Sequence, residues 1–388
     1  MINLWRKILV VLIIVFFVYF FLENNNVNIE KRPEKRGVFV SYIELSHYLK
    51  GMNKEQGITE INKIVNNLKK MNFNMIILQV RTFSDAIYPS TIYPWSETIT
   101  GQEGVSPGYD ILKAFIDIAH KNSMELHAWI NPYRIRGDED ATDLAVTNPA
   151  FSYLNSDMVC FSDGIFYNPA KEEVKQLIVA GVEEIVKKYS VDGILFDDYF
   201  YPNLDVDLND YNDYKKMHPD VSISEYRLFQ VSDLIQRVYK VCHKNKVLFG
   251  ISPDGNINNN YQKHFADVKK WGSNAGYVDY LMPQIYYGFY NEARAFYDSL
   301  KEWGVITSKV SLMPALAFYK VGTVDNYAKG GKEEWLNNND IIMREVLLSR
   351  NLDNYTGFSL FRYDYLFNVE LKTKTTMQEV KNIKKILK

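Results

Sequence analysis

The chain has 388 residues, of which 47% are hydrophobic and 24% are charged, and its formal net charge at pH 7 is −2. This composition excludes a mainly disordered chain, and the near-zero net charge provides no bulk field that would draw the protein to nucleic acid. The length suits one large α/β barrel or two ordinary domains. The 28 Tyr, 22 Phe and 6 Trp residues are compatible with two interpretations, aromatic packing in the core of a barrel and an aromatic cleft on which sugar rings stack.

The first residues carry the pattern of a membrane signal. Arg6 and Lys7 precede an uninterrupted apolar run over residues 8–22, and Glu23 and three asparagines follow it. A positive patch before an apolar run places the N-terminus in the cytoplasm and the remainder outside. The end of the run lacks the small side chains of a signal-peptide cleavage site. We therefore expect an uncleaved single-span anchor over residues 1–23 and a linker over 24–36, with a cleaved signal and a secreted protein as the alternative.

The remainder repeats one unit, a short apolar strand followed by an amphipathic helix. Strands are expected at 37–40, 74–80, 125–130, 193–196, 247–251, 279–285, 310–316 and 357–361. Helices are expected within 55–71, 109–122, 171–189, 224–243, 262–271, 291–303 and 333–349. Eight such units predict an α/β fold of the (β/α)8 TIM-barrel type over residues 37–370, with a final helix over 371–388. The alternative is a doubly wound sheet, but no Gly-rich phosphate-binding signature is present.

Only two cysteines occur, Cys160 and Cys242, so a disulfide framework is excluded. One bridge between them is an open alternative, and two buried small apolar residues are the favoured interpretation.

Polar side chains cluster after the predicted strands, where barrel enzymes carry their reactive groups. The strongest feature is the tandem pair Asp197 and Asp198 after the fourth strand. Two adjacent carboxylates there are unfavourable unless they are paired or used, and their mutual repulsion raises at least one pKa. Strand alternation places them on opposite faces, but if the strand ends at Phe196 both can face the cleft. Which of the two reacts is left open.

A glycosidase needs two carboxyl groups beside the scissile bond, or one if a substrate acetamido group acts as nucleophile. Asp254, after the fifth strand, is the second candidate, and Asp85 and Asp364 are weaker ones. The predicted substrate-binding residues are the other polar and aromatic side chains near the strand ends: Arg81, Asp85, Tyr88, Trp95, Asn131, Tyr133, Arg134, Tyr199, Tyr201, Gln284, Tyr286, Tyr287 and Arg362. The tyrosines and the tryptophan are expected to form stacking walls.

The six histidines are scattered and show no HxH, HExxH or CxxC spacing. We therefore expect no metal and no other cofactor. A serine nucleophile elbow of the GxSxG type is also absent.

Several segments together resemble a known family. In chain order they are RGVFVSYIEL, NFNMIILQVRTFSDAIYPS with YPWS, GYDIL, ELHAWINPYRI, YNPA, VDGILFDDYFYP, GISPDG and MPQIYYG. Between about Lys35 and Tyr365 the chain is similar to the bacterial glycosyl-hydrolase-like family 10 barrels. The resemblance implies an exported or envelope-bound glycoside hydrolase that acts on glycan strands such as peptidoglycan. Carried over by position, the family's motifs fall on Asp197 and Asp198, and on Arg81, Asp85, Asn131, Arg134, Asp254, Gln284 and Tyr286.

The segment DGILFDDY also looks like a distant relative of the chitinase-type DGxDxDxE strand, with Asp197 at the third acidic position. Tyr199 stands where that pattern has its proton-donating Glu, so the donor must come from Asp198 or from another strand. The expected function is therefore hydrolysis of a cell-envelope polysaccharide by carboxylate acid/base catalysis. A carbohydrate-binding barrel without turnover and a polysaccharide deacetylase are the alternatives, and the sequence does not indicate an oligomeric state.

Overall fold

The computed structural model describes residues 33–202 and 204–388. The predicted anchor, residues 1–23, and most of the predicted linker lie outside these residues. Within the described part, no helix is both long and apolar enough to span a lipid bilayer.

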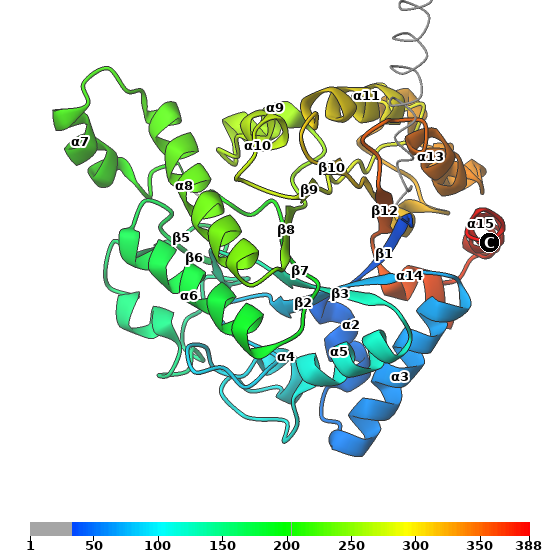
Figure 1. Cartoon of the computed structure of the whole chain (residues 1–388), viewed down its shortest axis with the longest axis horizontal. Helices are drawn as coiled ribbons and strands as arrows, with labels where there is room; N and C mark the ends of the chain where they lie inside the picture. The colour runs from blue at the N-terminus through cyan, green and yellow to red at the C-terminus, as the bar shows by residue number, and fades with distance from the viewer. Residues whose placement is uncertain (1–32, 203) are drawn as a thin grey trace, which may run out of the picture. The chain divides into compact units, whose positions relative to one another are not determined.

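A curled, parallel, nine-stranded sheet forms the centre of the unit Lys35–Lys388 (Figure 1). Its strands lie in the order β10-β9-β8-β7-β3-β2-β1-β12-β11. Their bounds are β1 Lys35–Val40, β2 Met75–Arg81, β3 Glu125–Ile130, β7 Gly193–Phe196, β8 Leu248–Ile251, β9 Tyr280–Leu281, β10 Ser311–Leu312, β11 Ala315–Leu316 and β12 Gly357–Leu360. The two end strands, β10 and β11, are separated in sequence only by Met313 and Pro314. This one segment pairs with β9 on one side and with β12 on the other, so the sheet returns on itself.

The nine strands thus occupy the eight predicted positions, because the seventh expected strand is split into β10 and β11. The parallel α/β arrangement is confirmed. The strands read as continuous apolar runs because both of their faces are buried. One set of side chains, which includes Met75, Ile77 and Leu195, fills the inside of the curl, and a much larger set packs between the sheet and the helices.

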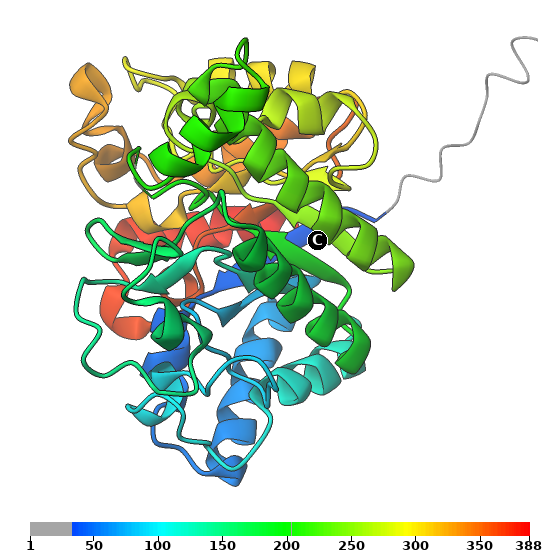
Figure 2. The ribbon, with the colours of Figure 1, turned by 90° about the vertical axis from the view of Figure 1, so that its left-hand side faces the viewer.

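Helices lie around the outside of the sheet (Figure 1; Figure 2). Those expected from the sequence are α3 Lys54–Lys70, α5 Ile111–Lys121, α6 Glu172–Lys188, α8 Ile223–Lys244, α10 Val268–Ser273, α11 Phe296–Ile306, α12 Glu334–Asn337, α13 Ile341–Ser349 and α15 Lys374–Ile386. Helix α9 (Ile257–Gln262) ends where the helix expected over 262–271 should begin. Helix α3 begins at a capping box formed by Asn53 and Gln56, and its buried stripe includes Ile61, Ile64 and Leu68. Helix α8 begins in the same way at Ser222 and Glu225.

Several elements were not expected from the sequence. Helix α2 (Tyr42–Leu49) follows β1 directly, and α4 (Glu97–Thr100), α7 (Leu208–Met217) and α14 (Tyr363–Phe367) lie in other connections. A small antiparallel sheet, β4 (Arg134–Arg136), β6 (Ile165–Tyr167) and β5 (Val159–Phe161), extends the connection after β3. Four short 3-10 helices complete the described part: Pro149–Tyr153, Phe318–Lys320, Lys329–Gly331 and Val369–Leu371.

Both cysteines are free thiols, so the alternative of a bridge is wrong. Cys242 is buried, as expected, and Cys160 is half-buried.

Candidate active site

The register of three strands brings the candidate residues together. Strands β3, β7 and β8 pair so that Ile130, Phe196 and Ile251 lie side by side. The residues that follow them, Asn131, Asp197 and Ser252, therefore lie at the same level, at the carboxyl end of the sheet.

Asp197 is buried and accepts hydrogen bonds from several directions. One carboxylate oxygen accepts from Trp129 Nε1 at 3.0 Å and also from Asn131 Nδ2. The other oxygen accepts from the Tyr199 backbone N–H at 3.4 Å. Donors of this kind stabilise an ionised carboxylate.

Asp198 lies in the same hollow but has fewer donors. Its carboxylate accepts a hydrogen bond from Gln284 Nε2 at 3.1 Å. Strand β7 ends at Phe196, which releases the two acids from strand alternation, and both face the hollow. The alternative that both carboxylates face the cleft is therefore the one observed.

Burial raises the pKa of both acids. For Asp197 the main cause is desolvation, and the charge of Asp198 adds to it. For Asp198 desolvation again comes first, while His264 and the Gln284 hydrogen bond oppose it. Because two like charges so close together are unfavourable, the pair retains a proton well above the usual range of a carboxyl group. Three donors favour the charged form of Asp197, whereas one hydrogen bond, from Gln284, favours that of Asp198.

The two acids line a hollow of about 330 Å³, which we call the acid-pair hollow. Aromatic rings make up much of its wall. Phe39 lies edge-on to Trp129 at 5.4 Å between ring centroids, and Phe361 lies 5.5 Å from Phe39. The Tyr286 ring continues this wall, 5.9 Å from Phe361. A concave site with aromatic walls and a few converging polar groups is typical of a small-molecule or saccharide site.

Arg134 supplies a positive charge to the hollow. Its guanidinium lies 5.0 Å from the centroid of the Phe83 ring and 5.3 Å from that of Tyr199, and its charge partly opposes the rise in the pKa of Asp197 that burial causes. Its Nε atom is buried and has no hydrogen-bond partner in the described part of the chain.

A second hollow, of about 400 Å³, adjoins the first on the side of β8 and β9, and we call it the β8–β9 hollow. It shares Asp198, Gln284 and Tyr286 with the acid-pair hollow and contains Asp254. The Asp254 carboxylate accepts from the Asn256 backbone at 2.7 Å and from Asn259 Nδ2 at 2.9 Å, and it lies 3.8 Å from His264 Nε2. Although burial opposes it, these partners lower the pKa of Asp254, so this acid is ionised.

The sequence-predicted residues divide into two groups. The residues that line one or both of these hollows are Asp197, Asp198, Asp254, Asn131, Arg134, Tyr199, Gln284, Tyr286 and Tyr287. The predicted residues that line neither hollow are Arg81, Asp85, Tyr88, Trp95, Tyr133, Tyr201 and Arg362.

The second group takes part in packing and in internal contacts. Arg81 is buried with its guanidinium 3.7 Å from the Tyr93 ring centroid, and Asp85 accepts from the Phe83 backbone at 3.2 Å. Tyr201 donates to Asp207 at 2.8 Å. Arg362 pairs with Glu44, and its Nη1 lies 3.4 Å from the Asp364 carboxylate.

The remaining three also contribute to internal structure. Tyr88 and Tyr133 are fully buried, and Trp95 is half-buried, with a backbone bridge to Ala86. We assign none of these seven residues a contact with substrate in the function proposed below.

The structure adds residues that the sequence did not single out for the site. Phe39, Trp129 and Phe361 form the aromatic wall, and Ser41 and Tyr42 also line the acid-pair hollow. Ser252 and Tyr319, which follow the fifth and seventh predicted strands, line it as well. The sequence pattern could have predicted two of these wall residues. Phe39 and Trp129 stand two positions before Ser41 and Asn131, so strand alternation turns them to the same inner face.

Comparison with known proteins finds similar chains that are named glycosyl hydrolases. The model of the family described as "Glycosyl hydrolase-like 10" matches residues 34–331. "Glycosyl hydrolase YngK" of Bacillus subtilis is 32% identical over 333 residues, which is 79% of this chain and 63% of that protein. The chain therefore spans less than two thirds of the length of that relative. "Glycosyl hydrolase DigH" of Escherichia coli K12 is 33% identical over 78% of this chain and 74% of its own length.

Solved structures share the fold at low sequence identity. The glycoside hydrolase domain of PgaB (BpsB) from Bordetella bronchiseptica has a TM-score of 0.53 at 12% identity, covering 85% of this chain and 94% of that one. The catalytic domain of a β-amylase from Paenibacillus polymyxa has a TM-score of 0.56 at 11% identity, covering 91% and 98%. A β-N-acetylhexosaminidase from Bacteroides fragilis has a TM-score of 0.54 at 10% identity, covering 91% and 66%. The curled parallel sheet is thus like that of TIM-barrel glycoside hydrolases.

Proposed function

Because this chain belongs to the glycosyl-hydrolase-like family 10, we propose that it hydrolyses glycosidic bonds in a cell-envelope polysaccharide, namely the glycan strands of peptidoglycan. One observation carries the proposal: two adjacent acids with raised pKa values, Asp197 and Asp198, line a hollow with aromatic walls at the carboxyl end of the sheet.

In this proposal Asp198 is the general acid. Its carboxyl group transfers a proton to the glycosidic oxygen as the bond from that oxygen to the anomeric carbon breaks. A water oxygen then bonds to the anomeric carbon and returns a proton to Asp198, so the net reaction consumes one water. A carboxyl group suits this role near neutral pH only if its pKa is raised, as the buried pair provides.

Asp197 has the complementary role. Trp129, Asn131 and the Tyr199 backbone stabilise its charge, so it remains anionic while Asp198 holds the proton. An anion there stabilises the positive charge that develops on the sugar ring, or orients a substrate acetamido group that attacks the anomeric carbon. Asp254 is the alternative for this role. It faces the β8–β9 hollow and is already engaged by two hydrogen-bond donors and His264, so we favour Asp197.

The choice of an amino-sugar polymer is supported by the walls and by the charge of the hollow. Trp129, Tyr286 and Phe361 offer large apolar rings that suit the faces of sugar rings. Arg134 offers a guanidinium for hydroxyl groups or for the carboxylate of a lactyl group. The two relatives described above, YngK and DigH, are both named glycosyl hydrolases, which agrees with the proposed reaction class.

The test is incubation of the purified full chain with peptidoglycan, with and without its stem peptides, followed by mass analysis of the products and measurement of new reducing ends. We expect glycan fragments whose total mass increases by one water per cut. Binding without new reducing ends would favour a carbohydrate-binding barrel instead. Release of acetate without chain cleavage would favour a deacetylase.

We also propose that residues 8–22 anchor the protein in the cell membrane with the remainder outside the cytoplasm. The apolar run and the preceding Arg6 and Lys7 support this placement. Protease added to cells with an opened cell wall and an intact membrane should digest the barrel. Protection until the membrane is lysed would contradict the placement.

A further inference from the structure

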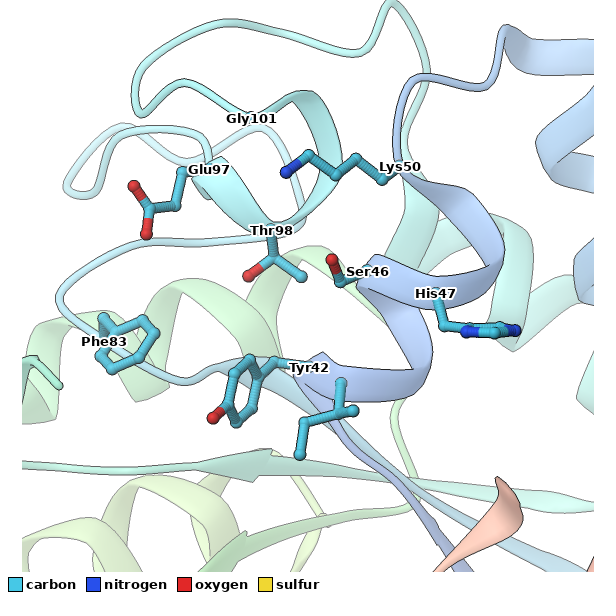
Figure 3. A pocket seen from close by; sticks show the side chains of 9 residues that line it. Tyr42, Ser46, His47, Lys50, Phe83, Glu97, Thr98 and Gly101 are labelled. Carbon is cyan, nitrogen blue, oxygen red and sulfur yellow. The ribbon is translucent and has the colours of Figure 1, made fainter. Parts of the chain in front are cut away.

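The acid-pair hollow, the β8–β9 hollow and a third hollow all lie at one end of the sheet. The third, of about 650 Å³, lies beside α2, α4 and the loop after β2, and Tyr42 and Ile43 line both it and the acid-pair hollow (Figure 3). Because α2 follows β1 and α4 follows β2, this hollow is also at the carboxyl ends of the strands. The opposite end, where the parallel strands begin, takes no part in the roles proposed above.

The end of the barrel where the strands begin is rich in lysine. Helices α3, α5, α6 and α8 each end on a lysine, and the strands β2, β3, β7 and β8 begin a few residues later. These lysines therefore lie beside the starts of the strands. We call this end the basic face and define it by its exposed lysines: Lys69, Lys70, Lys121, Lys187, Lys188, Lys244, Lys246, Lys309, Lys384, Lys385 and Lys388.

The last helix brings its lysines to the same face. The Leu387 carbonyl, directly after α15, accepts hydrogen bonds from Arg36 Nη1 at 2.8 Å and from Asn72 Nδ2 at 2.9 Å. Arg36 is in β1, and Asn72 lies between α3 and β2, so α15 ends beside the starts of two strands. The lysines at the end of α15 are thus held next to the strand from which the chain continues toward the proposed anchor.

Several acids at this end are engaged in internal contacts. Asp192 accepts a hydrogen bond from the Leu126 backbone N–H at 2.7 Å and lies 2.9 Å from His120 Nε2. Asp279 makes the same two contacts, with a backbone N–H of β8 at 2.8 Å and with a histidine of α8 at 2.9 Å. Glu125 forms an ion pair with the lysine that begins β1.

The lysines of the basic face, in contrast, mostly retain an uncompensated charge. Among residues 33–202 and 204–388, Lys187 is the one member of the set that pairs with an acid, Glu183, at 2.6 Å. Lys69 donates to the Asn122 carbonyl at 2.7 Å, which leaves its charge in place. Asp353, before β12, is an exposed acid at this end, but the lysines outnumber it. The basic face therefore carries a net positive charge.

The opposite end of the barrel carries exposed acids. Asp138, Glu139, Asp140 and Asp143 lie in the connection that leaves the carboxyl end of β3, and all four are exposed. The chain as a whole has a net charge of only −2, but this charge is distributed unevenly between the two ends of the barrel. An anionic surface therefore attracts one end and repels the other.

The covalent connection to the proposed anchor leaves from the basic face. Lys35 begins β1 at that face, and residues 24–34 join it to the proposed anchor over residues 1–23. A fully extended segment of this length spans at most about 40 Å. A barrel on so short a tether can lie on the bilayer, and the end that carries the tether is the end that carries the lysines.

We propose that the basic face docks on anionic lipid headgroups of the membrane that holds the anchor. Docking in this way turns the acid-pair hollow away from the bilayer, toward the glycan. The inference rests on the proposed anchor, which brings the face to the lipid. Lysines near an anionic bilayer act together through their charge, and salt screens the attraction. Cations at helix ends also stabilise the helix dipoles, but that role requires no lipid.

The test measures docking of the full chain reconstituted in vesicles. A dye on Ser308→Cys, an exposed position on the basic face, transfers energy to an acceptor on the lipid headgroups. A dye on Thr142→Cys reports from the acidic end, and both variants carry Cys160→Ser to remove the half-buried thiol. Adding phosphatidylglycerol to phosphatidylcholine vesicles should raise transfer from the first dye and not from the second. Salt at about 1 M, where the Debye length is about 3 Å, should abolish the rise.

A charge variant tests the lysines themselves: Lys70→Gln, Lys121→Gln, Lys244→Gln and Lys384→Gln. Each lysine near an anionic surface contributes about fivefold to the docking equilibrium, so the ratio of docked to undocked protein should fall at least about tenfold. The matched control loses the same charge from exposed positions in the connections after the strands: Lys50→Gln, Lys54→Gln, Lys263→Gln and Lys332→Gln. It should leave the ratio unchanged, and both variants should keep the circular dichroism spectrum of the unmodified chain.

The absence of a rise with phosphatidylglycerol would overturn the proposal, as would an equal loss of docking in both lysine variants. Binding of soluble polyphosphate through the four lysines, with no response to phosphatidylglycerol, would overturn it in favour of an anionic polymer. If the full chain does not float with phosphatidylcholine vesicles, the anchor proposal fails. The basic face is then tested by flotation with phosphatidylglycerol vesicles, which the unmodified chain should show and the charge variant should lose.

Discussion

Two buried acid pairs in this protein have similar electrostatics and different surroundings. Asp197 and Asp198 lie at the end of β7, whereas Glu345 on α13 and Glu379 on α15 lie where those two helices pack together. Desolvation is the main cause of the raised pKa in all four groups, and the Glu379 charge adds to the shift of Glu345.

The difference between the pairs is access. The aspartates line a hollow of about 330 Å³, whereas both glutamates are 0% exposed and line none of the three hollows. Among residues 33–202 and 204–388, neither Glu345 oxygen has a hydrogen-bond partner, while Glu379 accepts from the Met343 backbone at 2.9 Å. A raised pKa therefore does not identify an active site unless a ligand can reach the group. We expect the first pair to govern turnover and the second to govern stability.

The largest expected effect comes from Asp198→Asn. The amide cannot donate a carboxylic proton, so release of reducing ends from glycan should fall at least about 10³-fold. General acid catalysis alone contributes a factor of this order, and the variant also loses the proton that the two acids share. The melting temperature should not fall, because the change keeps the volume and removes a like-charge repulsion. The matched control is Glu345→Gln, which makes the same change from acid to amide in the other pair and should retain activity. Unchanged reducing-end release by Asp198→Asn would remove the assignment.

A smaller effect is expected from Trp129→Phe, which removes one donor to Asp197. Because that donor stabilises the ionised carboxylate, its loss raises the pKa of Asp197. The acidic limb of the kcat/KM profile, where Asp197 becomes protonated, should move to higher pH by about one unit. The alkaline limb, where the pair loses its last proton, should move less. Trp271→Phe, which removes a Trp N–H that donates to Ser232 outside the three hollows, should leave both limbs in place.

The third prediction concerns stability and leaves turnover unchanged. Burial raises the folded-state pKa of Glu379 from the ordinary value of a glutamate, about 4.5, to about 7. Between these values the folded protein holds a proton that the unfolded chain has released, so the free energy of unfolding falls as pH rises from about 4.5 through 7. The double variant Glu345→Gln, Glu379→Gln should reduce this fall by about 1–3 kcal/mol between pH 5 and pH 8, measured by urea unfolding. An unchanged pH dependence would show that the two glutamates are not the source.

The sequence was most informative about the alternation of strands and helices. Parallel strands buried on both faces are runs of apolar residues, and the helices that cover them carry stripes such as Ile61, Ile64 and Leu68, so both are recognisable locally. The seventh strand is an instructive exception. It is one apolar run in the sequence, but Pro314 has no N–H to donate, and the strand divides into β10 and β11 on either side of it.

For the site, the sequence determined that Asp197, Asp198, Asn131 and Gln284 lie at the carboxyl end of the sheet, because each follows or ends a strand. It did not separate these residues from Arg81, Tyr88 and Tyr133, which end or follow predicted strands but are buried away from the hollows. That separation was decided by tertiary packing: the hollows are bounded by α2, the β8–β9 loops and rings from distant strands, and their contacts join residues far apart in the chain. Local patterns of hydrophobicity set which residues enter the sheet, whereas the shape of a cavity depends on side chains that meet only after folding.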